Sequence, residues 1–185
     1  MVREYLEQNV FEALQSRLKF LFEEFDNIYV SFSGGKDSGL LLNLVLDYRR
    51  KYYPEKTLGV FHQDFEAQYT VTTEYVERTF ERIKDEVEPY WVCLPMATRT
   101  ALSSYEMYWY PWDDTKKDSW VRPMPQKEYV INLDNNPMTT YTIGCTRKTW
   151  QSSLEDGTSC PMERRKPSVC WESVRMSLSR GTAAF

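Results

Sequence analysis

A short β-rich run that breaks on two glycines and continues into a helix constrains the fold more than any other feature of the sequence. Residues 28–32 read Ile-Tyr-Val-Ser-Phe, a composition typical of a buried strand, and Gly34 and Gly35 end that strand. Apolar residues at three- and four-residue spacing then predict a helix over residues 37–50. The sequence therefore places a tight loop between a strand and the N-terminus of a helix.

The alternation of strands and helices continues along the chain. Further strands are predicted over residues 58–62 and 90–94, and further helices over residues 3–25 and 67–86. Strands that alternate with helices of this length imply an α/β fold with a parallel sheet and right-handed crossovers. The buried stripes of the three helices are predicted to hold Phe11, Leu14, Leu18, Leu21, Phe22, Phe25, Leu40, Leu41, Leu44, Val45, Tyr69, Thr73, Val76, Phe80 and Ile83.

Length and composition exclude several classes of protein. The 185 residues suit one domain, and 42% hydrophobic with 27% charged residues excludes a mainly disordered chain. A net charge of −4 argues against broad electrostatic binding of nucleic acid. No apolar run approaches the roughly 20 residues of a membrane span, and the first residues carry no signal-peptide core. We therefore expect a cytoplasmic protein that does not insert into membranes.

The composition changes near residue 140. Residues 1–139 hold 16 basic and 23 acidic residues, a balance of −7, whereas residues 140–185 hold 7 and 4, a balance of +3. The second part also holds three of the four cysteines. We interpret residues 1–139 as the folded domain, with the aromatic, proline-rich residues 97–139 as a lid or an insertion. Residues 140–185 form an atypical tail.

One hypothesis for this tail is translation out of frame from about residue 140. Read from the third base of each codon, residues 171–178 can encode Gly-Ile-Arg-Ala-Asp-Glu-Ser, in which the glycine is forced by the codons of Trp171 and Glu172. The alternative is a natural basic, serine-rich tail that is disordered or binds a partner. Sequencing the encoding DNA distinguishes the two. If the frame is lost, the sheet is expected to be incomplete.

The loop after the first strand carries the residue types that bind phosphate. The glycines let the backbone turn and approach a ligand closely, and the N-terminus of the following helix attracts anions. Lys36 adds a positive charge, and Ser33 and Ser38 add hydroxyl donors. The alternative is an ordinary helix cap with Asp37 at the N-cap. The loop lacks the glycine spacing of a Walker A motif.

The run Ser33-Gly34-Gly35-Lys36-Asp37-Ser38 resembles the PP-loop of the ATP pyrophosphatase and phosphoadenosine-phosphosulfate (PAPS) reductase superfamily. Residues 29–42, 60–69 and 108–112 look closer to one branch of it, the PAPS-reductase-like proteins of phages and mobile elements. Some of those are described as co-activators of prophage gene expression, and the DNA phosphorothioation enzymes contain a similar domain.

This resemblance implies a fold and a site. The fold would be the three-layer, adenine nucleotide alpha hydrolase-like sheet with helices on both faces. Lys36 and Asp37 would be catalytic, and Mg²⁺ would be held by Asp37 and Asp64. The residues implied in nucleotide binding are Ser31, Ser33, Gly34, Gly35, Lys36, Asp37, Ser38 and Asp64.

The resemblance also implies a reaction class. Members act on ATP at its α-phosphate, with release of pyrophosphate, or on a sulfonucleotide such as PAPS. The alternative is a non-catalytic regulatory protein, such as a prophage gene-expression co-activator, with a protein partner. The chain departs from the reductases because it has neither a Glu-Cys-Gly-Leu-His tail nor a CxxC pair, so we expect neither PAPS reduction nor an iron–sulfur cluster.

Several further residues have two interpretations each. His62 is a base or ligand, or a structural residue, and its alternation with Phe61 favours the structural role. Asp64 and Glu66 share a metal, or lie in a solvated loop. Cys93 is predicted to be inert core.

The aromatic segment over residues 105–120, which includes Trp109, stacks a base or forms the core of a lid, and the lid is favoured. Arg122 binds a phosphate or sulfate of the substrate, or is a surface residue.

Overall fold

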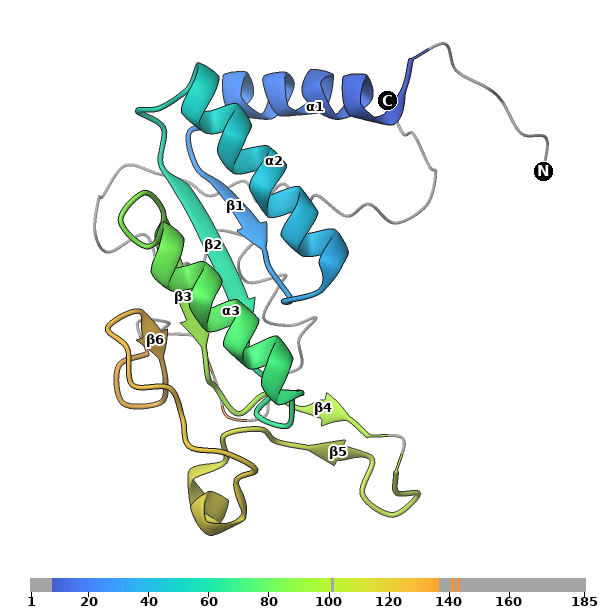
Figure 1. Ribbon diagram of the computed structural model, residues 1–185. Helices are drawn as coiled ribbons and strands as arrows, with labels where there is room; N and C mark the ends of the chain where they lie inside the picture. The colour runs from blue at the N-terminus through green and yellow to red at the C-terminus, as the bar shows by residue number, and fades with distance from the viewer. Residues whose placement is uncertain (1–7, 101, 137–140, 142, 144–185) are drawn as a thin grey trace, which may run out of the picture.

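A four-stranded parallel sheet, in the order β1-β2-β3-β6, organises the protein (Figure 1). The computed structural model describes residues 8–100, 102–136, 141 and 143. The main elements are α1 (Val10–Glu24), β1 (Ile28–Ser31), α2 (Lys36–Tyr52), β2 (Leu58–Gln63), α3 (Thr70–Ile83), β3 (Glu88–Val92) and β6 (Val130–Ile131). The remaining elements are β4 (Thr98–Arg99), β5 (Tyr108–Trp109) and the 3-10 helix η1 (Asp114–Ser119). The predicted α/β class with a parallel sheet is confirmed.

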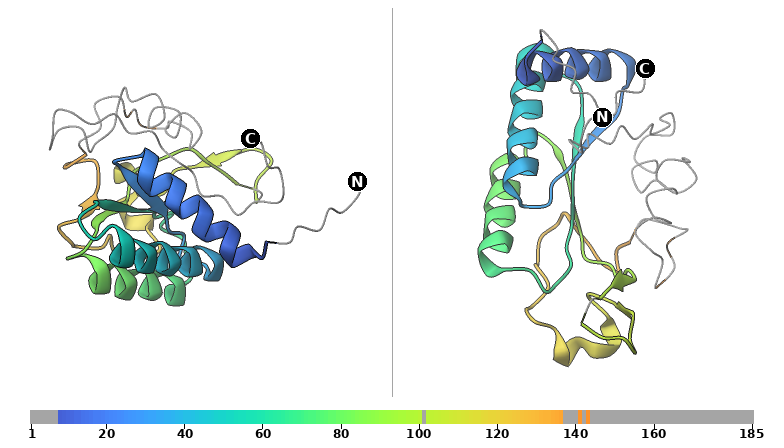
Figure 2. Two further views of the ribbon diagram at one scale, coloured as in Figure 1. Left: turned by 90° about the horizontal axis from the view of Figure 1, so that it is seen from above. Right: turned by 90° about the vertical axis from the view of Figure 1, so that its right-hand side faces the viewer.

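The two helices that connect β1 to β2 and β2 to β3 lie on the same face of the sheet (Figure 2). This follows from the strand order, since crossovers of one hand that step in one direction return over one face. Among the described residues, the opposite face carries no such helix, so this part of the fold has two layers, the sheet and the helices α2 and α3. The expected second helical layer is not found in this part of the chain.

Side-chain alternation along the strands divides the core between the two faces of the sheet. Val60 and Trp91 point toward α2 and α3 and belong to the larger apolar cluster, which also contains Phe80. Val92 and Ile131 belong to a smaller cluster on the opposite face. The larger cluster supports the ends of the strands that carry the predicted site.

Two helices begin later than their apolar periodicity predicts. A capping box explains α1: the Asn9 side chain accepts from the Glu12 amide, and the Glu12 carboxylate accepts from the Asn9 amide. Before α3, the backbone amide of Gln68 donates to the Glu66 carbonyl, and the helix starts only at Thr70. Tyr69 is therefore 86% exposed rather than buried.

The segment between β3 and β6 is more than a lid over the sheet. Its strands β4 and β5 form a separate antiparallel pair, whereas Val130 and Ile131 pair with Trp91 and Val92 and extend the main sheet. The interpretation of residues 140–185 as a foreign tail falls almost wholly outside the described residues. Along the residues that are described, no helix is both long and apolar enough to cross a membrane.

Candidate functional site

The predicted site residues lie along one edge of the sheet, where β1, β2 and β3 end (Figure 1). Parallel strands bring their carboxyl ends to the same edge, which is where ligands bind in open α/β sheets. The loop of residues 33–38 follows β1, and Asp64 follows β2. Arg122 reaches the same edge from the segment before β6. The structure thus brings Asp64 and Arg122 into contact and leaves the loop as a separate group.

The conformation of the loop depends on Gly34. Its φ of +79° lies in the left-handed region that side chains disfavour. A Cβ added there would lie 2.7 Å from Val76 Cγ2 and 2.8 Å from Thr72 Cγ2, both on α3. The loop therefore packs directly against the first half of α3, and no other residue type fits at this position without a local shift.

The hydroxyls of Ser33 and Ser38 form hydrogen bonds within the loop. The Ser38 hydroxyl donates to the Gly35 carbonyl at 3.0 Å, so its oxygen accepts from the Ser33 hydroxyl at 2.9 Å and from the Ser33 amide at 3.2 Å. The Gly35 amide donates to Ser33 Oγ at 3.4 Å. The loop conformation is therefore stabilised by hydrogen bonds between its own residues.

Helix α2 begins at the loop without a side-chain cap. The N-cap residue is Gly35, so the interpretation of Asp37 as the N-cap is wrong, and Asp37 lies in the first turn instead. The first amides of a helix have no partner within the helix. Gly35, Lys36 and Asp37 are exposed. The first turn of α2 therefore presents backbone donors, the positive end of the helix dipole and an ammonium group on the surface.

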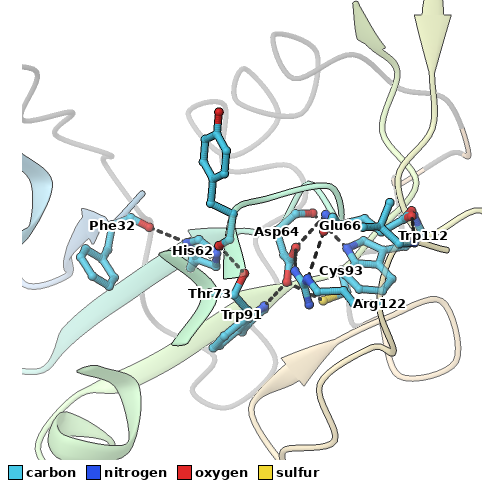
Figure 3. A network of polar contacts seen from close by, with 11 residues as sticks. Phe32, His62, Asp64, Glu66, Thr73, Trp91, Cys93, Trp112 and Arg122 are labelled. Carbon is cyan, nitrogen blue, oxygen red and sulfur yellow. Dashed lines mark hydrogen bonds and ion pairs between the residues drawn. The ribbon is translucent and has the colours of Figure 1, made fainter. Parts of the chain in front are cut away.

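Asp64 is buried, and both of its carboxylate oxygens are hydrogen bonded (Figure 3). Oδ1 accepts from the Glu66 amide at 2.8 Å and from Arg122 Nη2, with which Asp64 forms an ion pair. Oδ2 accepts from Trp91 Nε1 at 2.7 Å, and the Cys93 thiol lies 3.8 Å away. These contacts favour a structural role for Asp64 over a metal ligand.

Glu66 ties the aromatic segment to the end of β2. Its carboxylate accepts from the backbone amides of Trp112 and Val121, each at 2.9 Å. Within the described chain, Glu66 and Trp112 are the non-glycine residues with positive φ, at 62° and 58°. The side chain of Glu66 is thus a buried acceptor for two loop amides, which is the role that the sequence pattern did not predict.

Arg122 is held inside this network rather than directed at an open site (Figure 3). Besides its ion pair with Asp64, its Nε donates to the Glu66 carbonyl at 3.0 Å. Its guanidinium carbon lies 4.9 Å from the ring centroid of Trp112, a cation–π arrangement. The bonds of Arg122 in this structure are internal, and its binding of a phosphate or sulfate of a substrate stays a prediction.

The aromatic segment divides into a buried and an exposed part. Trp112 is buried and packs edge-on against Trp120 at 5.1 Å, as the lid-core interpretation expects. Tyr105 is 97% exposed. Trp109 lies on β5 opposite Thr98, outside the Asp64 network.

His62, in β2, and Cys93, directly after β3, are both fully buried near the carboxyl ends of these strands. Burial lowers the pKa of His62 and raises the pKa of the Cys93 thiol, so His62 is held neutral and Cys93 protonated. Cys93 is a free cysteine buried in the core, where the sequence predicted it. His62 Nδ1 lies 2.7 Å from the Phe32 carbonyl oxygen. Over the described residues, no group of three or more His, Cys, Asp or Glu side chains is arranged to hold a metal ion.

The fold and the site together define an α/β protein whose parallel sheet carries an uncapped, glycine-containing helix start at its carboxyl edge. No model of a known protein family matches the chain, and no solved structure matches it. An uncharacterized protein of Escherichia coli, YbdN, is 39% identical to it over 119 residues. The match covers 64% of this chain and 28% of YbdN, so the chain spans little more than a quarter of that relative's length.

Proposed function

We propose that the protein binds an adenine nucleotide, with the phosphates at the loop of residues 33–38 and the first turn of α2. The observation that carries the proposal is the start of α2, which lies exposed at the carboxyl edge of the sheet with glycine at its N-cap and no side chain capping it. Uncapped helix amides and a positive dipole end favour phosphate oxygens. Lys36 adds a full charge beside them.

The reaction that fits this site is attack at the α-phosphate of ATP with release of pyrophosphate, or the equivalent step on a sulfonucleotide. Negative charge grows on the phosphate oxygens in the transition state of such reactions. The α2 amides would stabilise that charge because the helix holds them in place before the substrate arrives, and the Lys36 ammonium in the same turn would add to the effect. The residues that the resemblance implies in nucleotide binding are Ser31, Ser33, Gly34, Gly35, Lys36, Asp37, Ser38 and Asp64, and all of them except Asp64 lie at the end of β1, in the loop or in the first turn of α2.

Magnesium would accompany the nucleotide, and of the predicted metal pair Asp37 and Asp64 we propose Asp37 as its ligand. Asp37 is exposed in the first turn of α2, whereas the oxygens of Asp64 already accept bonds from Arg122 and Trp91. Mg²⁺ usually keeps several waters and binds one or two carboxylates together with substrate phosphates. A single exposed carboxylate beside the phosphate loop meets that need.

The substitution Lys36→Ala tests the proposal. We expect isothermal titration calorimetry with ATP and Mg²⁺ to show binding by the unmodified protein and at least a tenfold loss of affinity in the variant, which is the effect of removing about 1.4 kcal/mol of interaction. Lys51→Ala is the matched control, because Lys51 lies in the last turn of the same helix. The control should bind like the unmodified protein.

Two results would argue against the proposal. If ATP, PAPS and adenosine phosphosulfate all fail to bind the unmodified protein, the loop is not a nucleotide site. If Lys36→Ala and Lys51→Ala weaken binding equally, the nucleotide binds elsewhere. A nucleotide that binds at the loop and is not turned over would favour the regulatory alternative over the enzyme.

A further inference from the structure

Both backbone polar groups of Phe32, the last residue before the loop, are hydrogen bonded to residues of β2. The ladder between β1 and β2 ends at Ser31 and Phe61, and the Phe32 amide then donates to the Phe61 carbonyl at 2.7 Å. The Phe32 carbonyl is bonded by a side chain, since His62 Nδ1 lies 2.7 Å from its oxygen (Figure 3). A carbonyl oxygen only accepts, so Nδ1 carries the hydrogen.

The imidazole ring of His62 packs against aromatic side chains. Its centroid lies 6.4 Å from that of Phe32, 6.3 Å from that of Phe80 and 5.2 Å from that of Trp91, which is edge-on. His62 is fully buried, and its Nε2 has no hydrogen-bond partner among the described residues. Leaving a buried polar atom unpaired is unfavourable. An apolar side chain would avoid that penalty, so the specific contribution of a histidine here is the Nδ1 bond.

We propose that His62 is a positioning residue for the phosphate loop, acting through its Nδ1–H bond to the Phe32 carbonyl. This bond replaces the ladder bond that a longer β1 would make, and it lets the chain leave the sheet after Phe32. Ser33 follows at once, and the position of Ser33 sets its bonds to Ser38 and Gly35. The bond therefore determines where the loop and the first turn of α2 lie relative to β2. The inference rests on the proposed function only for its nucleotide-binding readout.

Three substitutions at His62 test the proposal. An asparagine amide stands near the place of Nδ1 and can donate to Phe32, a glutamine amide stands near the place of Nε2, and a leucine donates nothing. We expect His62→Asn to keep the ATP affinity within about threefold, and His62→Gln and His62→Leu to weaken it at least tenfold. Phe80→Leu is the control for loss of core packing, because Phe80 packs against the same imidazole ring and lies outside the loop.

Backbone NMR of the nucleotide-free variants gives a second readout. The amide resonances of Ser33, Gly34 and Gly35 should move in His62→Gln and His62→Leu and stay close to their original positions in His62→Asn. Phe80→Leu should lower the melting temperature without moving these resonances or the affinity.

Either readout can overturn the inference. It is wrong if His62→Leu or His62→Gln keeps the loop resonances and the affinity of the unmodified protein, or if all three substitutions and Phe80→Leu behave alike. If the unmodified protein binds no nucleotide, the proposed function fails, and the loop resonances alone decide the role of His62. If His62→Leu does not fold, the comparison of His62→Asn with His62→Gln still decides it.

Discussion

Replacing Arg122 with methionine is expected to lower the free energy of unfolding by about 3–5 kcal/mol. The substitution leaves the carboxylate of Asp64 buried without its cationic partner. It also removes the guanidinium from the Trp112 ring and from the Glu66 carbonyl. Urea unfolding followed by circular dichroism measures the loss.

Two companion variants identify the origin of this effect. Arg50→Met removes a partly exposed arginine paired with Asp47 and Glu86, and such pairs contribute at most about 1 kcal/mol. The double substitution Asp64→Asn with Arg122→Met removes the orphaned charge and should recover part of the lost stability. If Arg122→Met costs no more than Arg50→Met, the buried ion pair does not hold the aromatic segment in place.

Replacing Gly34 with alanine is expected to disrupt the loop. The left-handed backbone costs an alanine roughly 1–2 kcal/mol, and its Cβ would collide with the side chains of Val76 and Thr72 on α3. The fold can relieve the collision only by moving the loop away from α3. We expect the free energy of unfolding to fall by about 2–4 kcal/mol, because the collision adds to the backbone penalty, and the affinity for ATP to weaken at least tenfold.

The neighbouring glycine provides the control for this variant. Gly35 has a φ of −81°, and a Cβ there would lie 3.4 Å from Ser33 Oγ, an ordinary contact. Gly35→Ala should therefore cost at most about 1 kcal/mol, the usual penalty of alanine at an N-cap. Equal losses in the two variants would contradict the geometry of the loop.

The sequence was sufficient to predict the elements around the loop because local rules act there. The β-rich run, the glycines and the apolar spacing of α2 all point to the same strand–loop–helix unit. Apolar spacing alone does not decide which side of a helix faces the sheet. Leu40 and Phe11 belong to the predicted buried stripes but are 59% and 57% exposed, and in α2 the face toward the sheet is occupied by Leu42 and Leu46.

The polar network around Asp64 could not be predicted, because it joins residues that are far apart in the sequence. Arg122 lies 58 positions from Asp64, and Trp112 lies 46 positions from Glu66. No spacing pattern links a carboxylate after β2 to an arginine before β6. The sequence held one weak signal for part of this network. Strand alternation puts the side chains of His62 and Trp91 on the helix-covered face of the sheet, and the indole of Trp91 donates to Asp64 there. The strand β6 was missed because it is two residues long.

A titration of the ¹⁵N-labelled protein with ATP and Mg²⁺, followed by NMR, shows where on the protein the nucleotide binds. We expect the largest amide shifts at Gly34, Gly35, Lys36, Asp37 and Ser38, because the phosphates would contact those backbone donors. We also expect these shifts to be lost in Lys36→Ala. Shifts centred on the exposed aromatic residues around Tyr105, or no shifts at millimolar nucleotide, would contradict it.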